Sequence, residues 1–154
     1  MITIVEIIRA VSGMVETVFG APPTTKDIRE GFERPCTKLS LLYSDVSREG
    51  KLRHETAQLE LVRFAARTDR GWIDLLRAQA ALTEALERPI QVDEQFHLVA
   101  EEVDFDPVRE DMALYCTFSV EWFQEALEDD WRGGSDQDMD ALDVNDEAWV
   151  RPDE

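Results

Sequence analysis

Apolar and polar residues alternate between Met112 and Phe123, and this run constrains the fold more than any other part of the chain. Successive residues of a strand point to opposite faces of a sheet, so one face of this run is apolar and the other is mostly polar. The apolar face carries Met112, Leu114, Cys116, Phe118, Val120 and Trp122. Such a strand belongs to a sheet that is covered on one face only.

Three further strands are expected from the same kind of pattern. The first covers Cys36 to Tyr43, the second is a long strand from Leu52 to Ala66, and the third covers Phe96 to Glu101. The polar run Ser44 to Lys51 contains Gly50, which predicts a hairpin loop between the first two. Pro107 is expected in an acidic turn before the last strand. Strands joined in this way form a largely antiparallel sheet.

Two helices are expected beside these strands. Apolar residues recur at steps of three and four from Ile2 to Phe19, and Gly20 with Pro22-Pro23 ends that pattern. The second helix begins near Gly71 or Trp72 and runs to Leu86, with Asp69 as its predicted cap. The sequence therefore predicts an α+β fold, in which a mostly antiparallel sheet of four or more strands carries both helices on one face.

Charge divides the chain into two parts. The 154 residues have a formal net charge of −18, and the segment from Glu125 to the end contributes 12 acidic and 2 basic residues. This balance argues against a protein that grips nucleic acid by its phosphates. We expect a domain over residues 1–127, large enough for a core of its own, and an acidic, flexible tail over residues 128–154.

The sequence contains no set of residues with the spacing of a known type of active site or cofactor site. Glycines are scattered, and His54 and His97 lie on separate predicted strands without cysteine partners. Cys36 and Cys116 are expected to be reduced residues of the core. We therefore expect no catalysis, cofactor or metal. One alternative stays open, because four acidic residues of the tail have the spacing of a calcium loop, although Ala141 replaces its glycine: Asp136, Asp138, Asp140 and Glu147.

The segment from Lys26 to Tyr43, KDIREGFERPCTKLSLLY, carries a resemblance to a known family. A Gly31-Phe32 pair and then Pro35-Cys36 opening a strand, after an apolar N-terminal helix, resemble the phage tail terminator family over about residues 2–124. The resemblance implies an α+β subunit that forms a hexameric ring on the finished tail tube. That ring stops tube growth and offers a surface to a neck or head-completion protein, without catalysing a reaction.

The resemblance also implies a place and partners. The protein would be made in the cytoplasm of the bacterial host and end at the head-proximal end of the virion tail, contacting the tail tube protein, with no membrane partner. Glu6 and Arg9 interrupt the N-terminal apolar stretch, which agrees with the last point. DNA would pass through an acidic ring without specific binding.

For docking, two loops are favoured by their geometry. The candidate interface residues are Ile28, Phe32 and Pro35 at the turn, and Ser47 to Lys51 at the expected hairpin tip. Phe32 could equally be a core ring that closes one end of the sheet. Two other functions remain open: another head–tail connector subunit, and an acidic DNA mimic that inhibits a nucleic-acid enzyme. The concentration of charge in the tail argues against the mimic.

Overall fold

The structure is a computed structural model, and it describes residues 1–25 and 32–126. The chain divides into two units, one formed by Met1–Ser47 with His54–Gln124 and the other by Arg48–Arg53 with Glu125–Glu154. Ile28, the predicted tail and its calcium-loop spacing lie outside the described residues. The boundary between a domain and a tail therefore stays a prediction.

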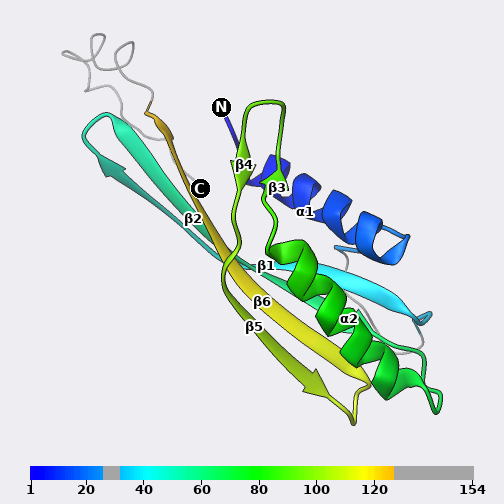
Figure 1. Ribbon diagram of the computed structural model, residues 1–154. Coiled ribbons are helices and arrows are strands. Elements are labelled where there is room, and N and C mark those ends of the chain that lie inside the picture. The colour runs from blue at the N-terminus through cyan, green and yellow to red at the C-terminus, as the bar shows by residue number, and fades with distance from the viewer. Residues whose placement is uncertain (26–31, 127–154) are drawn as a thin grey trace. The chain divides into compact units, whose positions relative to one another are not determined.

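Helices and strands of the described part confirm the predicted α+β class. Four strands form one sheet in the order β1-β2-β6-β5, and two short strands form a second sheet (Figure 1). The elements are α1 (Ile4–Phe19), β1 (Cys36–Glu49), β2 (Leu52–Phe64), α2 (Gly71–Leu86), β3 (Ile90–Gln91), β4 (His97–Leu98), β5 (Glu101–Val108) and β6 (Ala113–Glu125).

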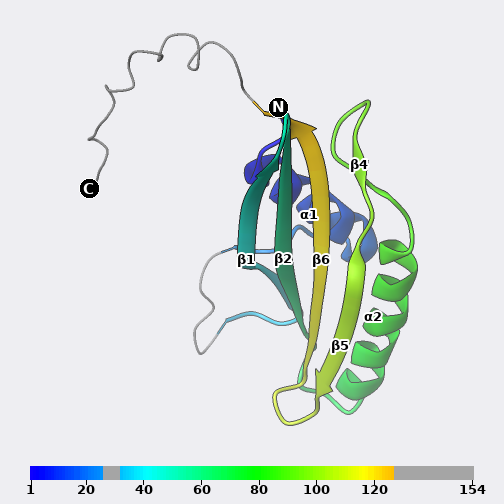
Figure 2. The ribbon, with the colours of Figure 1, turned by 90° about the vertical axis from the view of Figure 1, so that its left-hand side faces the viewer.

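Both helices lie on the same face of the four-stranded sheet, as Figure 2 shows from the side. The core between them combines the buried face of α1, the buried face of α2 and the inner faces of the central strands β2 and β6. The predicted apolar face of the last strand is confirmed, because Leu114, Cys116, Phe118, Val120 and Trp122 are all buried. The opposite face of the sheet, which we call the open face, carries no helix.

Helix α1 begins with a capping box that the sequence analysis did not single out. Thr3 accepts a hydrogen bond from the backbone N–H of Glu6 through its hydroxyl, while the Glu6 carboxylate accepts one from the Thr3 backbone. The helix ends where Gly20 takes a φ of 83°, which places its N–H on the carbonyl of Glu16. Local sequence therefore sets both ends of this helix.

Helix α2 begins at Gly71, one of the two predicted starting residues. The residue before it is Arg70, whose side chain makes no capping hydrogen bond, so the prediction of Asp69 as the cap was wrong. Gly71 instead lies against the backbone carbonyl of Ala66 and the side chain of Met112, where a β-carbon would collide. Close approach of the chain, rather than a polar cap, sets the start of α2.

Three strand boundaries differ from the prediction. The run Ser44 to Lys51 is not a loop: β1 continues to Glu49 and the turn consists of Gly50, with a φ of 62°, and Lys51. The expected third strand is split into β4 and β5. Pro107 lies within β5, opposite Leu114, rather than in a turn. A proline is compatible with β5 because that strand is at the edge of the sheet.

Candidate functional site

The turn that leads into β1 is held by an arginine whose role the sequence did not reveal. Phe32 is half-buried and packs edge-to-face on Phe64 with ring centroids 4.8 Å apart. The Arg34 guanidinium carbon lies 5.0 Å from the ring of Phe32 and 5.2 Å from that of Phe64. Phe32 is thus part of the packing at this end of the sheet, and its predicted interface role stays a prediction.

Arg34 also ties the turn to two other segments. Its Nη1 donates to the carbonyl oxygens of Ala65 at 3.0 Å, Asp111 at 3.1 Å and Met112 at 3.4 Å. Burial, and next the positive charge of Arg67, lower the pKa of the Arg34 guanidinium. An arginine before a proline carries no sequence signal for these contacts, because the accepting carbonyls are 31 to 78 residues away.

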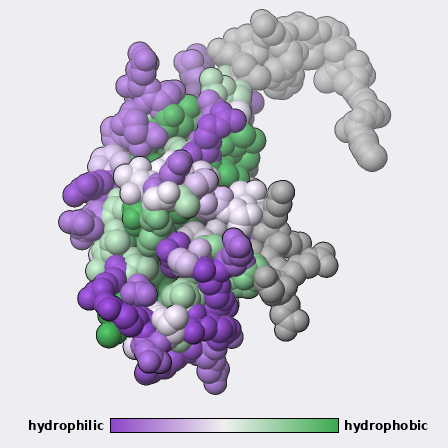
Figure 3. Space-filling view, turned by 90° about the vertical axis from the view of Figure 1, so that its right-hand side faces the viewer, coloured by the Kyte–Doolittle hydropathy of each residue, from purple (hydrophilic) through white to green (hydrophobic). Residues whose placement is uncertain are grey.

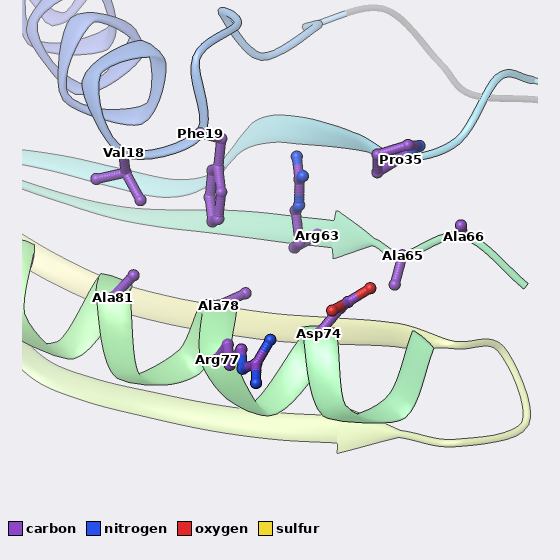
Figure 4. A pocket seen from close by; sticks show the side chains of 10 residues that line it. All are labelled: Val18, Phe19, Pro35, Arg63, Ala65, Ala66, Asp74, Arg77, Ala78 and Ala81. Carbon is purple, nitrogen blue, oxygen red and sulfur yellow. The ribbon is translucent and has the colours of Figure 1, made fainter. Parts of the chain in front are cut away.

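A cavity of about 310 Å³ opens beside Pro35, between the C-terminal end of α1 and the side of α2 (Figure 4). Its charged residues are Arg63 from β2 and Asp74 and Arg77 from α2. Arg63 lies 4.1 Å above the ring of Phe19 and donates to the Thr37 hydroxyl at 2.9 Å. The remaining walls are small and apolar: Val18, Ala65, Ala66, Ala78 and Ala81.

The helix-covered face continues this character. A second hollow between the helices is lined by Met14 and Val18 of α1 and by Ala81 and Ala85 of α2. In Figure 3 hydrophobic and weakly polar residues occupy the middle of this face, and hydrophilic residues surround them. The second hollow is also lined by Thr17, Glu84 and Arg88, so its walls combine apolar and polar side chains.

The open face of the sheet is acidic. Asp104 and Asp106 of β5 pair with Thr117 and Tyr115 of β6, so their carboxylates follow one another along the edge of this face. Burial is the main cause that raises the pKa of Tyr115, and the charges of Asp111, Glu60 and Asp106 raise it further. These effects place several carboxylates within electrostatic reach of one phenol.

An aromatic pair lies at the far end of the open face. His54 stacks on Phe123 with ring centroids 4.3 Å apart and an interplanar angle of 11°, and its Nε2 is 2.6 Å from Glu121 Oε1. A shallow hollow of about 410 Å³ adjoins it, lined mainly by polar and acidic groups: Tyr43, Thr56, Gln58, Glu101, Glu102, Ser119 and Glu121. The His54 side chain is partly exposed in this pair.

The second half of β1 presents the most exposed apolar surface of any strand. Within the described residues, Thr37 and Leu39 are the buried side chains of β1, whereas every residue from Leu41 to Glu49 is exposed. Four of these are large and apolar, with exposed fractions between 41% and 59%: Leu41, Leu42, Tyr43 and Val46. We call them the β1 edge patch. Ser47 ends this stretch, and Lys51 lies in the turn.

The sequence analysis noted Leu42 but missed the β1 edge patch. Polar residues at Ser44, Asp45 and Ser47 indicate a loop when read alone, and Val46 stands isolated among them. Alternation does not continue past Tyr43, because the next apolar residue, Val46, is three positions further on, so the strand pattern gives no signal for the patch. The two-residue turn at Gly50–Lys51 leaves no room for a loop.

Possible metal ligands do not cluster in the described part of the chain. No group of three or more His, Cys, Asp or Glu side chains in residues 1–25 and 32–126 could hold a metal ion. Cys36 and Cys116 are free thiols; Cys116 is fully buried, which raises its pKa to about 12. In the same ranges, no helix is long and apolar enough to cross a membrane.

The arrangement therefore offers surfaces for docking: an apolar strand edge, a groove between helices and an acidic open face. A comparison with curated proteins found no significant match. A family model described as phage tail terminator protein matches residues 6–131, which is most of the chain and includes every strand of the sheet. The protein belongs to the phage tail terminator family, whose members are structural proteins of the virion tail.

Proposed function

We propose that this protein caps the tail tube as a ring of identical subunits, with six as the expected number. The ring stops polymerisation of the tube and provides the surface to which a neck or head-completion protein attaches. The observation that carries this proposal is the family match over residues 6–131. The protein acts by assembly, without catalysis, after synthesis in the cytoplasm of the bacterial host.

The geometry of the first unit supports a role in assembly. The β1 edge patch exposes four large apolar side chains on a strand whose outer backbone groups are bridged by Thr24 only as far as Leu39 in the described residues. An exposed apolar edge of this length invites pairing with another chain. Leu41 to Tyr43 carry no charge or proline, and Asp45 is the charged residue within the stretch from Leu41 to Ser47.

The open face supports the passage of DNA without specific binding. Like charges repel the phosphate backbone, and this face carries Asp104, Asp106 and Glu121 along two neighbouring strands. We propose that the open face turns towards the lumen of the ring. Residues 1–124 as a whole carry a formal charge of −8, so repulsion does not depend on the segment after Gln124.

The test is a tube-capping assay. Purified tail tube protein is allowed to polymerise with increasing amounts of this protein, and tube lengths are measured by negative-stain electron microscopy. We expect shorter tubes, each with extra density at one end. Tubes that grow to the same length without terminal density would overturn the proposal.

A second assay separates the lumen from the cap. Replacing Asp104 and Asp106 by lysine leaves the apolar core untouched, because both side chains are exposed. We expect capping to persist, while DNA release from assembled particles slows as the lumen gains positive charge. Asp104→Asn with Asp106→Asn is the matched control for the loss of negative charge alone. Unchanged DNA release in the lysine variant would place the open face elsewhere.

A further inference from the structure

A second exposed apolar patch lies on α2, and it is far from the β1 edge patch. Ile73 and Leu76 are exposed by 49% and 44%, and Ala80 follows on the same side of the helix. This side is opposite the buried residues Leu75, Ala78 and Leu82. We call Ile73, Leu76 and Ala80 the α2 stripe. A shallow hollow runs along it, lined by Leu76, Gln79, Ala80, Thr83, Glu84 and Glu87.

The two patches lie on opposite sides of the first unit. β1 and β5 are the two edges of the sheet, and α2 contacts β5. Figure 2 shows β1 at one side of the sheet and α2 beyond β5 at the other. Two different patches on opposite sides allow head-to-tail contact between identical subunits, which closes into a ring, whereas a single self-complementary patch gives a twofold dimer.

The far edge of the sheet is protected against strand pairing. β5 exposes Glu101, Glu102, Asp104 and Asp106, contains Pro107, and is irregular where Glu102 takes a φ of 54°. Charges, proline and irregular backbone are the usual devices that keep an edge strand from pairing. The β1 edge patch has none of these at Leu41, Leu42 and Tyr43. A neighbour therefore reaches β1 by some element other than β5.

We infer that the α2 stripe of one subunit covers the β1 edge patch of the next, and that this contact is the seam of the ring. A helix laid along an exposed edge is one of the ways in which proteins cover it. The stripe lies within the eight helical residues Ile73 to Ala80, about 12 Å, and the patch within the six strand residues Leu41 to Val46, about 20 Å, so the stripe fits within the length of the patch. This inference depends on the proposed ring and specifies the contact between its neighbouring subunits.

Polar groups of the α2 hollow suit a strand edge as well. The Gln79 amide and the Thr83 hydroxyl line the hollow beside Leu76 and Ala80. The Thr83 hydroxyl donates to the Gln79 carbonyl at 2.8 Å, which leaves its oxygen free to accept a hydrogen bond from an edge N–H. Both kinds of group that an edge strand exposes, apolar side chains and backbone amides, therefore find partners on α2.

Mixing of variants tests the seam. Val46→Lys places a charge in the β1 edge patch and leaves α2 intact, whereas Leu76→Lys places a charge in the α2 stripe and leaves β1 intact. Sedimentation velocity over a concentration series should show a closed oligomer for the unmodified protein and monomers for each variant alone. An equimolar mixture of the two variants should form a dimer and nothing larger, because one seam in that pair keeps both of its patches.

Control variants separate charge and folding from the seam. Val5→Lys adds the same charge at a valine that is 57% exposed, close to the 59% of Val46, and should leave the oligomer unchanged. Leu42→Lys and Ile73→Lys repeat the test at second positions of each patch. Circular dichroism before each run confirms that the variants fold, as exposed positions should allow.

Three results would overturn the seam. Leu76→Lys protein that dimerises alone would show a self-complementary contact through β1. A normal oligomer in both lysine variants would show that neither patch is used, while the ring itself stands. Unmodified protein that stays monomeric throughout would refute the seam, and the tube-capping assay then decides separately whether the proposed function survives.

Discussion

Arg34 joins three segments of the chain through one guanidinium group. Its two aromatic neighbours and three carbonyl acceptors come from the turn, the end of β2 and the loop before β6. Lysine matches the charge but lacks the planar fork that serves stacking and several acceptors at once. The side chain therefore acts as a structural clamp beside the predicted docking turn.

The clamp predicts a specific stability pattern. Arg34→Ala should lower the free energy of unfolding by about 2–3 kcal/mol, because charged hydrogen bonds to the part-buried carbonyls of Ala65 and Met112 are lost together with the contacts to two aromatic rings. Arg34→Lys should recover less than half of that loss. Arg67→Ala is the control, since Arg67 is exposed and bonds carbonyls at 3.3 and 3.5 Å; its effect should stay below about 0.5 kcal/mol. Equal losses for the two alanine variants, measured by urea unfolding, would contradict the clamp.

Cys116 predicts how stability depends on alkaline pH. Its thiol has a pKa of about 12 in the folded chain, raised from an ordinary value of 9.0, so below about pH 9 the thiol is protonated in both the folded and the unfolded state. Above that pH the unfolded chain releases the proton and the folded chain retains it, which favours unfolding. The free energy of unfolding should fall by roughly 2 kcal/mol between about pH 8 and about pH 10.5 from this group alone.

Urea unfolding of Cys116→Ala provides the comparison for that slope. The variant lacks the thiol, so its stability should fall less steeply over the same pH range, although its value at pH 8 is lower by the cost of a small cavity. Parallel slopes in the two proteins would show that other groups account for the whole pH dependence.

At the scale of elements, two glycines in helices should respond to alanine in opposite ways. At Gly71 a β-carbon meets the Ala66 carbonyl and lies 3.1 Å from the Met112 sulfur, so Gly71→Ala should destabilise the protein by about 2–3 kcal/mol. At Gly13 of α1 nothing lies within 4 Å, so Gly13→Ala should stabilise it by about 0.5–1 kcal/mol. Thermal unfolding of the two variants measures both signs, and a stabilised Gly71→Ala would refute the close approach at the start of α2.

Elements with one dominant pattern were predictable from the sequence. The first helix, the second helix and the alternating face of β6 appear within a residue or two of their predicted bounds. The α+β class follows because each pattern leaves one face to be buried. In these elements the local sequence pattern and the tertiary contacts favour the same structure, so the pattern alone predicts them.

Elements whose shape depends on distant partners were not predictable. β1 continues through Ser44, Asp45 and Ser47 because β2 pairs with it. Side chains on both faces of this part of β1 are exposed, so its sequence has no alternation of apolar and polar residues that would predict a strand. The sequence analysis placed Pro107 in a turn. A proline fits a strand at the edge of a sheet, and the order of the four strands, which puts β5 at the edge, is not visible in the local sequence. The contacts of Arg34 and the α2 stripe were missed for the same reason, since both depend on tertiary arrangement.

At the scale of the whole molecule, the net charge of −18 opposes assembly. Each added subunit brings like charge, and the Debye length shrinks from about 30 Å at 0.01 M salt to about 8 Å at 0.15 M. The proposed seam is apolar and loses little on screening. The oligomer fraction should therefore rise several-fold between these two salt concentrations, as light scattering at constant protein concentration can measure. Dissociation on adding salt would indicate a seam held by ion pairs instead.

The unequal edges of the sheet, one apolar and one acidic, give the assembled object a direction. If every subunit offers β1 to the same side, all subunits in the circle are oriented alike, and the two rims of the circle consist of different residues. A ring with two different rims can bind the end of a tube in one orientation only. The order of assembly, tube first and head second, would then depend on the difference between the two edges of one sheet.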